Sequence, residues 1–220
     1  MSYATSSLYN TLFNIKPFML GGGLTSEKRI FLFKTFLNLI VQLAITYFVM
    51  TKTHLSIPNW ILFVSTLFII LIISLVPMHP ILKFLLFSIF SVVMGILLSN
   101  DIQGVDKTTV QFAILGTACI FISMIIAALI LLSLGIELGF YTFIFLFFGL
   151  LIGLLFSILQ FYISVNQPWL SYSIILLFSI FIIYDTQQIL KRNYYGDFIT
   201  ASMDYYLDII NIFVRVLKNH

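Results

Sequence analysis

Long apolar runs separated by short polar loops determine what this chain can fold into. Six runs are long enough to cross a bilayer as α-helices, because about 20 residues at ~1.5 Å per residue span its hydrocarbon core. A seventh, shorter run follows them. The runs cover residues 30–50, 60–76, 80–99, 109–134, 139–163, 169–190 and 201–217. The sequence therefore predicts an all-α integral membrane protein, a seven-helix bundle of six helices around a central C-terminal helix that either spans the membrane or is re-entrant.

The composition agrees with this class and leaves no room for a separate soluble domain. Hydrophobic residues make up 61% of the 220-residue chain and charged residues 9%, and the mean hydropathy is +1.11, as in helical membrane proteins. We expect a cytosolic N-terminal tail over residues 1–28, with an interfacial segment at 8–20, and a single transmembrane domain over residues 29–220. The single cysteine, Cys119, excludes a disulfide framework, and the net charge of +3 gives no sign of a nucleic-acid partner.

The basic residues of alternate loops predict the orientation. One side carries Lys16, Lys28, Arg29, Lys34, Lys83, Lys191 and Arg192. The other side carries only Lys52 and Lys107, so the positive-inside rule places the N-terminus and the turn at 191–200 in the cytosol. Arg215 and Lys218 leave the last helix open, because a full span would place them outside and a re-entrant segment would return them to the cytosol.

Two aspartates lie inside the last two apolar stretches. At ~1.5 Å per residue, Asp185 lies roughly 8 Å from the polar turn and Asp208 roughly 10 Å from it, so two antiparallel helices hold the carboxyl groups at nearly matched depth. An ionised carboxylate in hydrocarbon costs roughly 2.5–3.5 kcal/mol even on a lenient scale. Two neighbouring carboxylates cannot both ionise cheaply, so Asp185 and Asp208 are expected to form a proton switch or a cation site.

The last helix carries further polar residues on one face. Its stripe consists of Asp204, Asp208, Asn211 and Arg215, spaced four, three and four residues apart. The other faces are apolar, so we expect this helix in the middle of the bundle, with its stripe turned toward Asp185 and Gln188. The alternative is a surface helix whose charged face lies in water, but the apolar segment IINIF (209–213) favours burial.

The same stretches resemble a known family. IIYDTQQI (182–189), DFITAS (197–202) and YYLDIINIF (205–213), and more weakly TVQFAILGTACIFI (109–122), are similar to the transmembrane Bax-inhibitor-motif family. That family includes bacterial calcium-leak proteins and the cellular and viral Golgi anti-apoptotic proteins. The resemblance implies a seven-helix protein that leaks Ca²⁺, or protons with it, under control of the aspartate pair, with Asp185 and Asp208 as the candidate calcium ligands. No cofactor is expected.

The resemblance also bears on location and partners. It implies the Golgi or endoplasmic reticulum for a eukaryotic or viral protein and the inner membrane for a bacterial one. The expected partners are the lipid bilayer, calcium ions, protons and membrane proteins of apoptosis.

A basic cluster often begins the third helix of this family and pairs with the aspartate of the sixth. Here His79 and Lys83 occupy that place, and either could pair with Asp185; His79 would make the contact titrate near neutral pH. Alternatively, His79 is a solvated loop residue and Lys83 a lysine that reaches the membrane surface. Met94 stands where several family members have a glutamate, which puts in doubt whether conductance or selectivity is the same.

The sequence does not predict an enzyme. Two aspartates on adjacent membrane helices also describe an intramembrane aspartyl protease, and Tyr184 before Asp185 fits the first half of that pattern. The second half requires Gly-x-Gly-Asp within a helix, whereas Gly196 and Asp197 lack the first glycine and lie in a loop. No serine, cysteine or zinc hydrolase motif is present. A non-transporting scaffold that modulates cell-death partners stays open as another function class.

Overall fold

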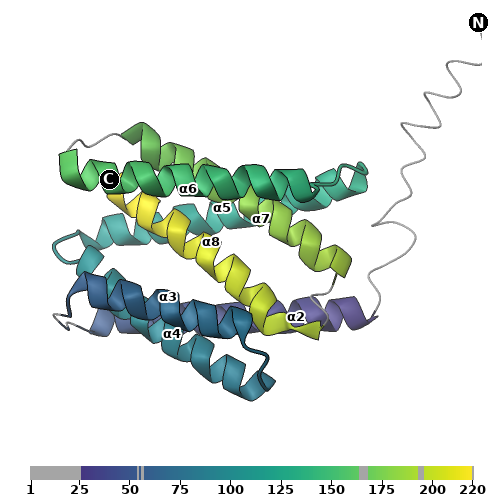
Figure 1. Ribbon diagram of the computed structural model, residues 1–220, viewed down its shortest axis with the longest axis horizontal. Helices are drawn as coiled ribbons and strands as arrows, with labels where there is room; N and C mark the ends of the chain where they lie inside the picture. Colours follow the sequence, from purple (N-terminus) through teal and green to yellow (C-terminus); the bar gives the residue numbers. More distant parts are fainter. Residues whose placement is uncertain (1–25, 54, 56, 164–167, 193–195, 220) are drawn as a thin grey trace, which may run out of the picture.

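The computed structural model describes residues 26–53, 55, 57–163, 168–192 and 196–219. The helices of this part of the chain are α2 (Ser26–Lys52), α3 (Asn59–Leu75), α4 (Pro80–Asp101), α5 (Lys107–Ser133), α6 (Phe140–Ile163), α7 (Pro168–Arg192) and α8 (Phe198–Lys218), shown in Figure 1. The predicted all-α class and number of helices are confirmed, and each helix lies within a few residues of its apolar run. Residues 26–28 are helical although they were assigned to the tail, and the rest of that tail lies outside the described residues.

Local sequence explains where several helices begin. Asp106 and Asp197 are the N-caps of α5 and α8, and Asp197 accepts a hydrogen bond from the Thr200 backbone N–H at 3.0 Å. Pro80 occupies the first turn of α4, where its missing N–H does no harm. His79 caps the same helix, since its Nδ1 accepts from the backbone N–H of Ile81 at 3.3 Å.

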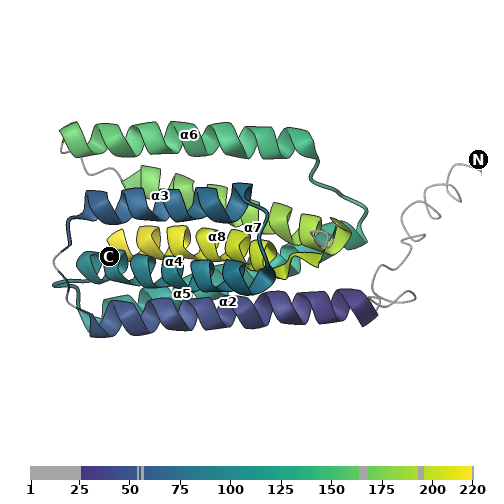
Figure 2. The same ribbon diagram turned by 60° about the horizontal axis from the view of Figure 1, so that its bottom comes forward.

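α8 lies between two groups of three helices in Figure 1 and in the middle of the bundle in Figure 2. In the first group, which we call the first half, α4 packs against α2 and α3; in the second half, α7 packs against α5 and α6. The main contacts of α8 are with α2, α5 and α7, with a smaller one to α4, whereas α3 and α6 lie further out. The predicted central position of the C-terminal helix is confirmed, and both halves use it as their common core.

α8 runs from one end of the bundle to the other. Its 21 residues extend about 31 Å, close to the thickness of a bilayer's hydrocarbon core. Asp197 at its start pairs with Lys83, while Lys218 at its end lies 3.8 Å from Asp101, at the far end of α4. The structure therefore shows a full-length helix and not a re-entrant segment. A surface helix is excluded as well, because both tyrosines 205 and 206 are 0% exposed.

The outer surface of the bundle is suited to lipid. By length and composition, α2, α4, α5 and α7 could each cross a membrane, and α3 and α6 contribute shorter apolar helices, Asn59–Leu75 and Phe140–Gly153. Large apolar side chains such as Phe48, Trp60 and Phe145 are exposed on these helices, which water would disfavour and hydrocarbon would accommodate. The chain is an integral multi-pass membrane protein.

Basic residues gather at one end of the bundle, as the alternation of loops predicts. Lys28 donates to the Leu190 carbonyl at 2.9 Å, Lys83 pairs with Asp197, and Lys191 lies 2.6 Å from Glu137. We call this the basic end. The opposite end, where Asp101 meets Lys218, also carries Lys52 and Lys107 at the ends of α2 and α5; we call it the Asp101 end. That the basic end faces the cytosol stays a prediction of the positive-inside rule.

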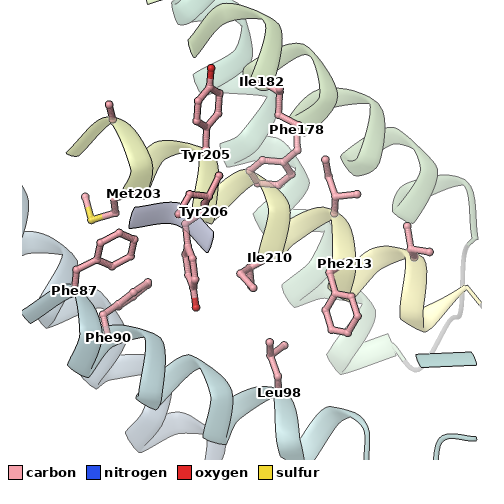
Figure 3. Close-up of a cluster of buried hydrophobic side chains, with 14 of the residues drawn as sticks. Phe87, Phe90, Leu98, Phe178, Ile182, Met203, Tyr205, Tyr206, Ile210 and Phe213 are labelled. Atoms are coloured by element: carbon pink, nitrogen blue, oxygen red, sulfur yellow. The ribbon is translucent and has the colours of Figure 1, made fainter. Parts of the chain in front are cut away.

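Two consecutive tyrosines of α8 connect it to both halves (Figure 3). The ring of Tyr206 packs edge-on against Phe87 and Phe90 of α4, with centroid distances of 5.4 and 5.7 Å. The ring of Tyr205 packs edge-on against Phe121 of α5 at 5.3 Å. The ring of Tyr205 also stacks on Phe36 of α2, with a centroid distance of 5.8 Å. The tyrosine pair therefore joins α8 to the first half through both rings and to the second half through Tyr205.

Candidate functional site

Asp185 of α7 and Asp208 of α8 bring their carboxyl groups within hydrogen-bonding reach of each other. Asp208 is 5% exposed, and its Oδ2 has no hydrogen-bond partner among the described residues. A carboxylate has no proton to donate, so the contact between these groups is favourable only when one of them carries a proton. The sequence placed the two groups at matched depth, and the structure brings them together where α7 meets α8, with Asp208 buried and Asp185 half-buried.

Asp204 lies one helical turn before Asp208 on α8. It is half-buried, and its charge acts on both Asp185 and Asp208. Three acids therefore lie near one another where α7 meets α8. Even so, no group of three or more His, Cys, Asp or Glu side chains in the described part of the chain is arranged to hold a metal ion. Since Ca²⁺ takes six to eight oxygen ligands, these acids do not form a complete calcium site.

The polar stripe of α8 turns inward only in part. Asp208 is buried and Arg215 is half-buried, but Asn211 is exposed and donates to the carbonyl of Leu207 on its own helix at 2.7 Å. The prediction that the whole stripe faces Asp185 is therefore wrong at Asn211. The reason is that the neighbouring helices cover the apolar faces of α8 and leave the stripe as its least buried face.

Gln188 does not join the acids. Its amide nitrogen donates to the carbonyl of Leu138 at 3.5 Å, in the loop between α5 and α6. The neighbouring Gln187 accepts from the Leu138 N–H at 2.8 Å and donates to the Ile136 carbonyl at 3.2 Å. The two glutamines attach the end of α7 to this loop, because a loop that packs against a membrane helix must find partners for its backbone groups.

Lys83 pairs with Asp197 and not with Asp185. Its ammonium group contacts the Asp197 carboxylate and donates to the Thr200 hydroxyl at 2.6 Å. α4 and α8 both begin at the basic end, so Lys83 meets the N-cap of α8, whereas Asp185 lies deeper and on a helix of the other half. His79 is exposed and caps its own helix. The predicted latch of His79 or Lys83 on Asp185 is therefore absent, and Lys83 joins α4 to α8 instead.

The pair of Lys83 and Asp197 is expected to persist from neutral pH to below about pH 4. Burial alone would raise the pKa of Asp197, but hydrogen bonds from Lys83 and Thr200 outweigh it and hold this pKa below its ordinary value. Such a carboxyl adds stability above its unfolded pKa of about 3.9, and that stability is lost as pH falls through the lower folded pKa.

We therefore expect Asp197→Asn to lower the free energy of unfolding at pH 7 by no more than about 1 kcal/mol, because the pair is partly exposed. The loss should shrink as pH falls below about 4. Thermal unfolding in detergent across this range measures it. If Asp197→Asn lowered the free energy of unfolding equally at pH 7 and pH 3, the charge of Asp197 would contribute nothing to stability.

A buried polar network joins α2, α4 and α8, and sequence reasoning missed it. Its members are Asn38, Gln42, Thr46, Ser88, Ser91, Ser202 and Tyr206. Thr46 and Tyr206 share a hydrogen bond of 2.6 Å, and Ser91 donates to the Gln42 side chain at 2.9 Å. Asn38, Gln42 and Thr46 recur every fourth residue in an apolar run, a spacing that places them on one helix face and could have revealed them.

The hydroxyl of Tyr205 fastens α8 to the second half beside the acids. The Tyr205 hydroxyl donates to the Thr186 hydroxyl at 2.9 Å, one residue along α7 from Asp185. α8 is thus attached to the first half by the polar network, and to the second half by this bond and by the contact between Asp185 and Asp208.

Comparisons with known proteins agree with the resemblance seen in the sequence. Residues 28–219 match the model of the family described as inhibitor of apoptosis-promoting Bax1. A BI1-like protein of Arabidopsis thaliana is 44% identical over 43 residues, which are 20% of this chain and 17% of that protein. The region matched by the family model contains almost all of α2, all the later described helices, and both Asp185 and Asp208. The chain therefore belongs to the Bax-inhibitor family of membrane proteins.

Proposed function

We propose that this protein is a pH-sensitive cation leak, with Ca²⁺ as its main cargo, and that Asp185 and Asp208 form its gate. The observation that carries the proposal is the contact of two carboxyl groups inside a membrane bundle, one of which has an unsatisfied oxygen. Acids in such a place are expensive and typically functional. The polar network on the other side of α8 joins this helix to the first half without any charged group, so helices of this bundle can be held together without buried acids.

The pair has two arrangements that differ by a proton. With one proton, the carboxyl groups hydrogen-bond and hold α7 against α8. Without it, two carboxylates repel each other, and either the helices separate or a cation enters between them. The pair of Lys83 and Asp197 keeps its charges throughout the neutral range, since its carboxyl has a depressed pKa. The pH response is therefore assigned to Asp185 and Asp208.

An incomplete calcium site suits passage better than storage. Asp185, Asp208 and Asp204 supply part of the six to eight oxygens that Ca²⁺ requires, and water would supply the others. An ion held this weakly can leave again, as conduction demands. Beyond the pair, the least buried face of α8 continues through Asn211 and Arg215 toward the Asp101 end, and this stripe would line the route.

The family suggests where such a leak would act. A controlled leak from the Golgi or endoplasmic reticulum, with the basic end in the cytosol, would lower the stored calcium that promotes cell death. We propose this as the link between the aspartate pair and the family's anti-apoptotic description. The function proposed is transport and not catalysis.

Calcium flux into liposomes tests the proposal directly. Vesicles that contain the purified protein should take up Ca²⁺ faster than empty vesicles, and the rate should change between about pH 5 and pH 8. Folded protein without flux at any pH in this range would refute the leak and leave the membrane scaffold. Cleavage of a transmembrane reporter peptide in the same vesicles would instead indicate a protease.

A further inference from the structure

A cavity of about 850 Å³ opens between α2 and α5, and α8 forms its floor. The floor residues Ile209, Ile210 and Phe213 lie on the face of α8 opposite the polar stripe, given 100° per residue. α2 belongs to the first half and α5 to the second, and these two helices are not among the pairs of described helices that pack closely. The cavity therefore lies between the two halves.

Water is a poor occupant for this cavity. A buried water needs two to four polar partners, and apart from Tyr47 and Gln111 the lining side chains are apolar or already hydrogen-bonded. Thr46 bonds to Tyr206 and to the backbone carbonyls of Gln42 and Ser91, and Thr117 donates to the Ala113 carbonyl at 2.7 Å. Ile40 and Leu115 line the cavity and are 63% and 67% exposed. Its mouth therefore opens to hydrocarbon.

Charges at the Asp101 end indicate which lipid fits. α2 ends at Lys52, two residues after Met50 of the cavity wall, and α5 begins at Lys107, one turn before Gln111 of the wall. Both lysines are exposed, and two ammonium groups at the membrane surface attract the phosphate of a lipid headgroup.

The length of the cavity is also suited to a lipid chain. The wall residues of α2 run from Phe36 to Met50, about 21 Å at ~1.5 Å per residue. One leaflet of a bilayer contributes about 15 Å of hydrocarbon. An acyl chain that enters at the Asp101 end can therefore lie in the cavity through the full thickness of one leaflet.

We propose that the cavity binds one acyl chain of a bilayer phospholipid, whose phosphate lies between Lys52 and Lys107. The lipid touches the first half through α2 and the second half through α5. It is then a second element, besides α8, that contacts both halves, and its site is independent of the aspartate pair.

Native mass spectrometry of the purified protein tests the site, because it counts the lipids that stay bound after dilution into detergent. Ala118 and Ala44 line the cavity, so Ala118→Phe fills it from α5 and Ala44→Phe fills it from α2. Cys119→Phe is the matched control, since Cys119 is the exposed neighbour of Ala118 and does not line the cavity. Protein from phosphatidylglycerol vesicles should keep one phospholipid in the wild type and in the control. In each cavity-filling variant, the fraction of protein that retains a phospholipid should be at least several-fold lower.

The headgroup contact has its own variant. Lys52→Gln combined with Lys107→Gln should lower phospholipid retention several-fold and leave the folded fraction unchanged, as judged by thermal unfolding. Retention in Ala44→Phe and Ala118→Phe equal to that in the control would overturn the site. A bound sterol or a second copy of the chain in place of phospholipid would overturn the occupant. Unchanged retention in the lysine variant would remove the lysines from the proposal.

Discussion

Asp185→Asn and Asp208→Asn are each expected to remove most of the pH dependence of Ca²⁺ flux. Asparagine keeps the size and hydrogen-bonding capacity of aspartate but has no proton to lose in this range. The two groups are in contact and titrate as a unit, so the double variant should do little more than either single one. Between pH 5 and 8 the wild-type rate should change several-fold, because one pH unit shifts a protonation equilibrium by up to about tenfold. The variants should show nearly constant rates in the liposome assay.

Asp204→Asn is the internal control for that experiment. Asp204 is half-buried and one turn nearer the basic end than Asp208, so its loss should alter the response less. Equal effects of Asp204→Asn and Asp208→Asn would refute the assignment of the gate. If the pair were only structural, the asparagine variants would instead lose stability or expression while the remaining protein kept its pH response.

Tyr206→Ala is expected to destabilise the bundle by about 3 kcal/mol or more, the range measured for buried aromatic residues. Tyr206 is 0% exposed, and its ring packs against Phe87 and Phe90. In a membrane such packing is what holds helices together, since lipid is as apolar as the core. Chemical unfolding in detergent micelles measures the loss.

Tyr206→Phe separates the ring from the hydroxyl. It should cost only about 0.5–1.5 kcal/mol, because Thr46 keeps its hydrogen bonds to the Gln42 and Ser91 carbonyls when the Tyr206 hydroxyl is removed. Equal losses for the alanine and phenylalanine variants would show that the hydrogen bond, and not the packing of the ring, carries the contribution.

The number of helices and the depth of the acids could be predicted from the sequence, because a chain in hydrocarbon must satisfy its backbone within helices. Which side chains meet could not. Lys83 was assigned to Asp185 from the family pattern and helix order, which do not show that α4 and α7 belong to different halves. The contact with Asp197 depends on that division. The depth of a side chain along its helix follows from counting residues, whereas the side chains that it contacts depend on how the helices pack.

The same limit applied to the polar network. Asn38, Gln42 and Thr46 stand out as polar residues in an apolar run, yet nothing local shows that Ser91 and Tyr206 come to meet them from distant parts of the chain. Conversely, the stripe of α8 was regular enough to predict a buried face. The structure departs from it at Asn211, whose side chain lies on the least buried face of α8 and is exposed.

The shared position of α8 has a consequence for how the protein is made. α8 is the last of the described helices to leave the ribosome, and chains are synthesised at about 5–20 residues per second. Until α8 has been synthesised, Asn38 of the first half and Thr186 of the second half lack their α8 partners. Assembly of the whole bundle is thus postponed until α8 arrives. A ribosome that stops before α8 would release two groups of helices with exposed polar side chains, the kind of product that membrane quality control removes.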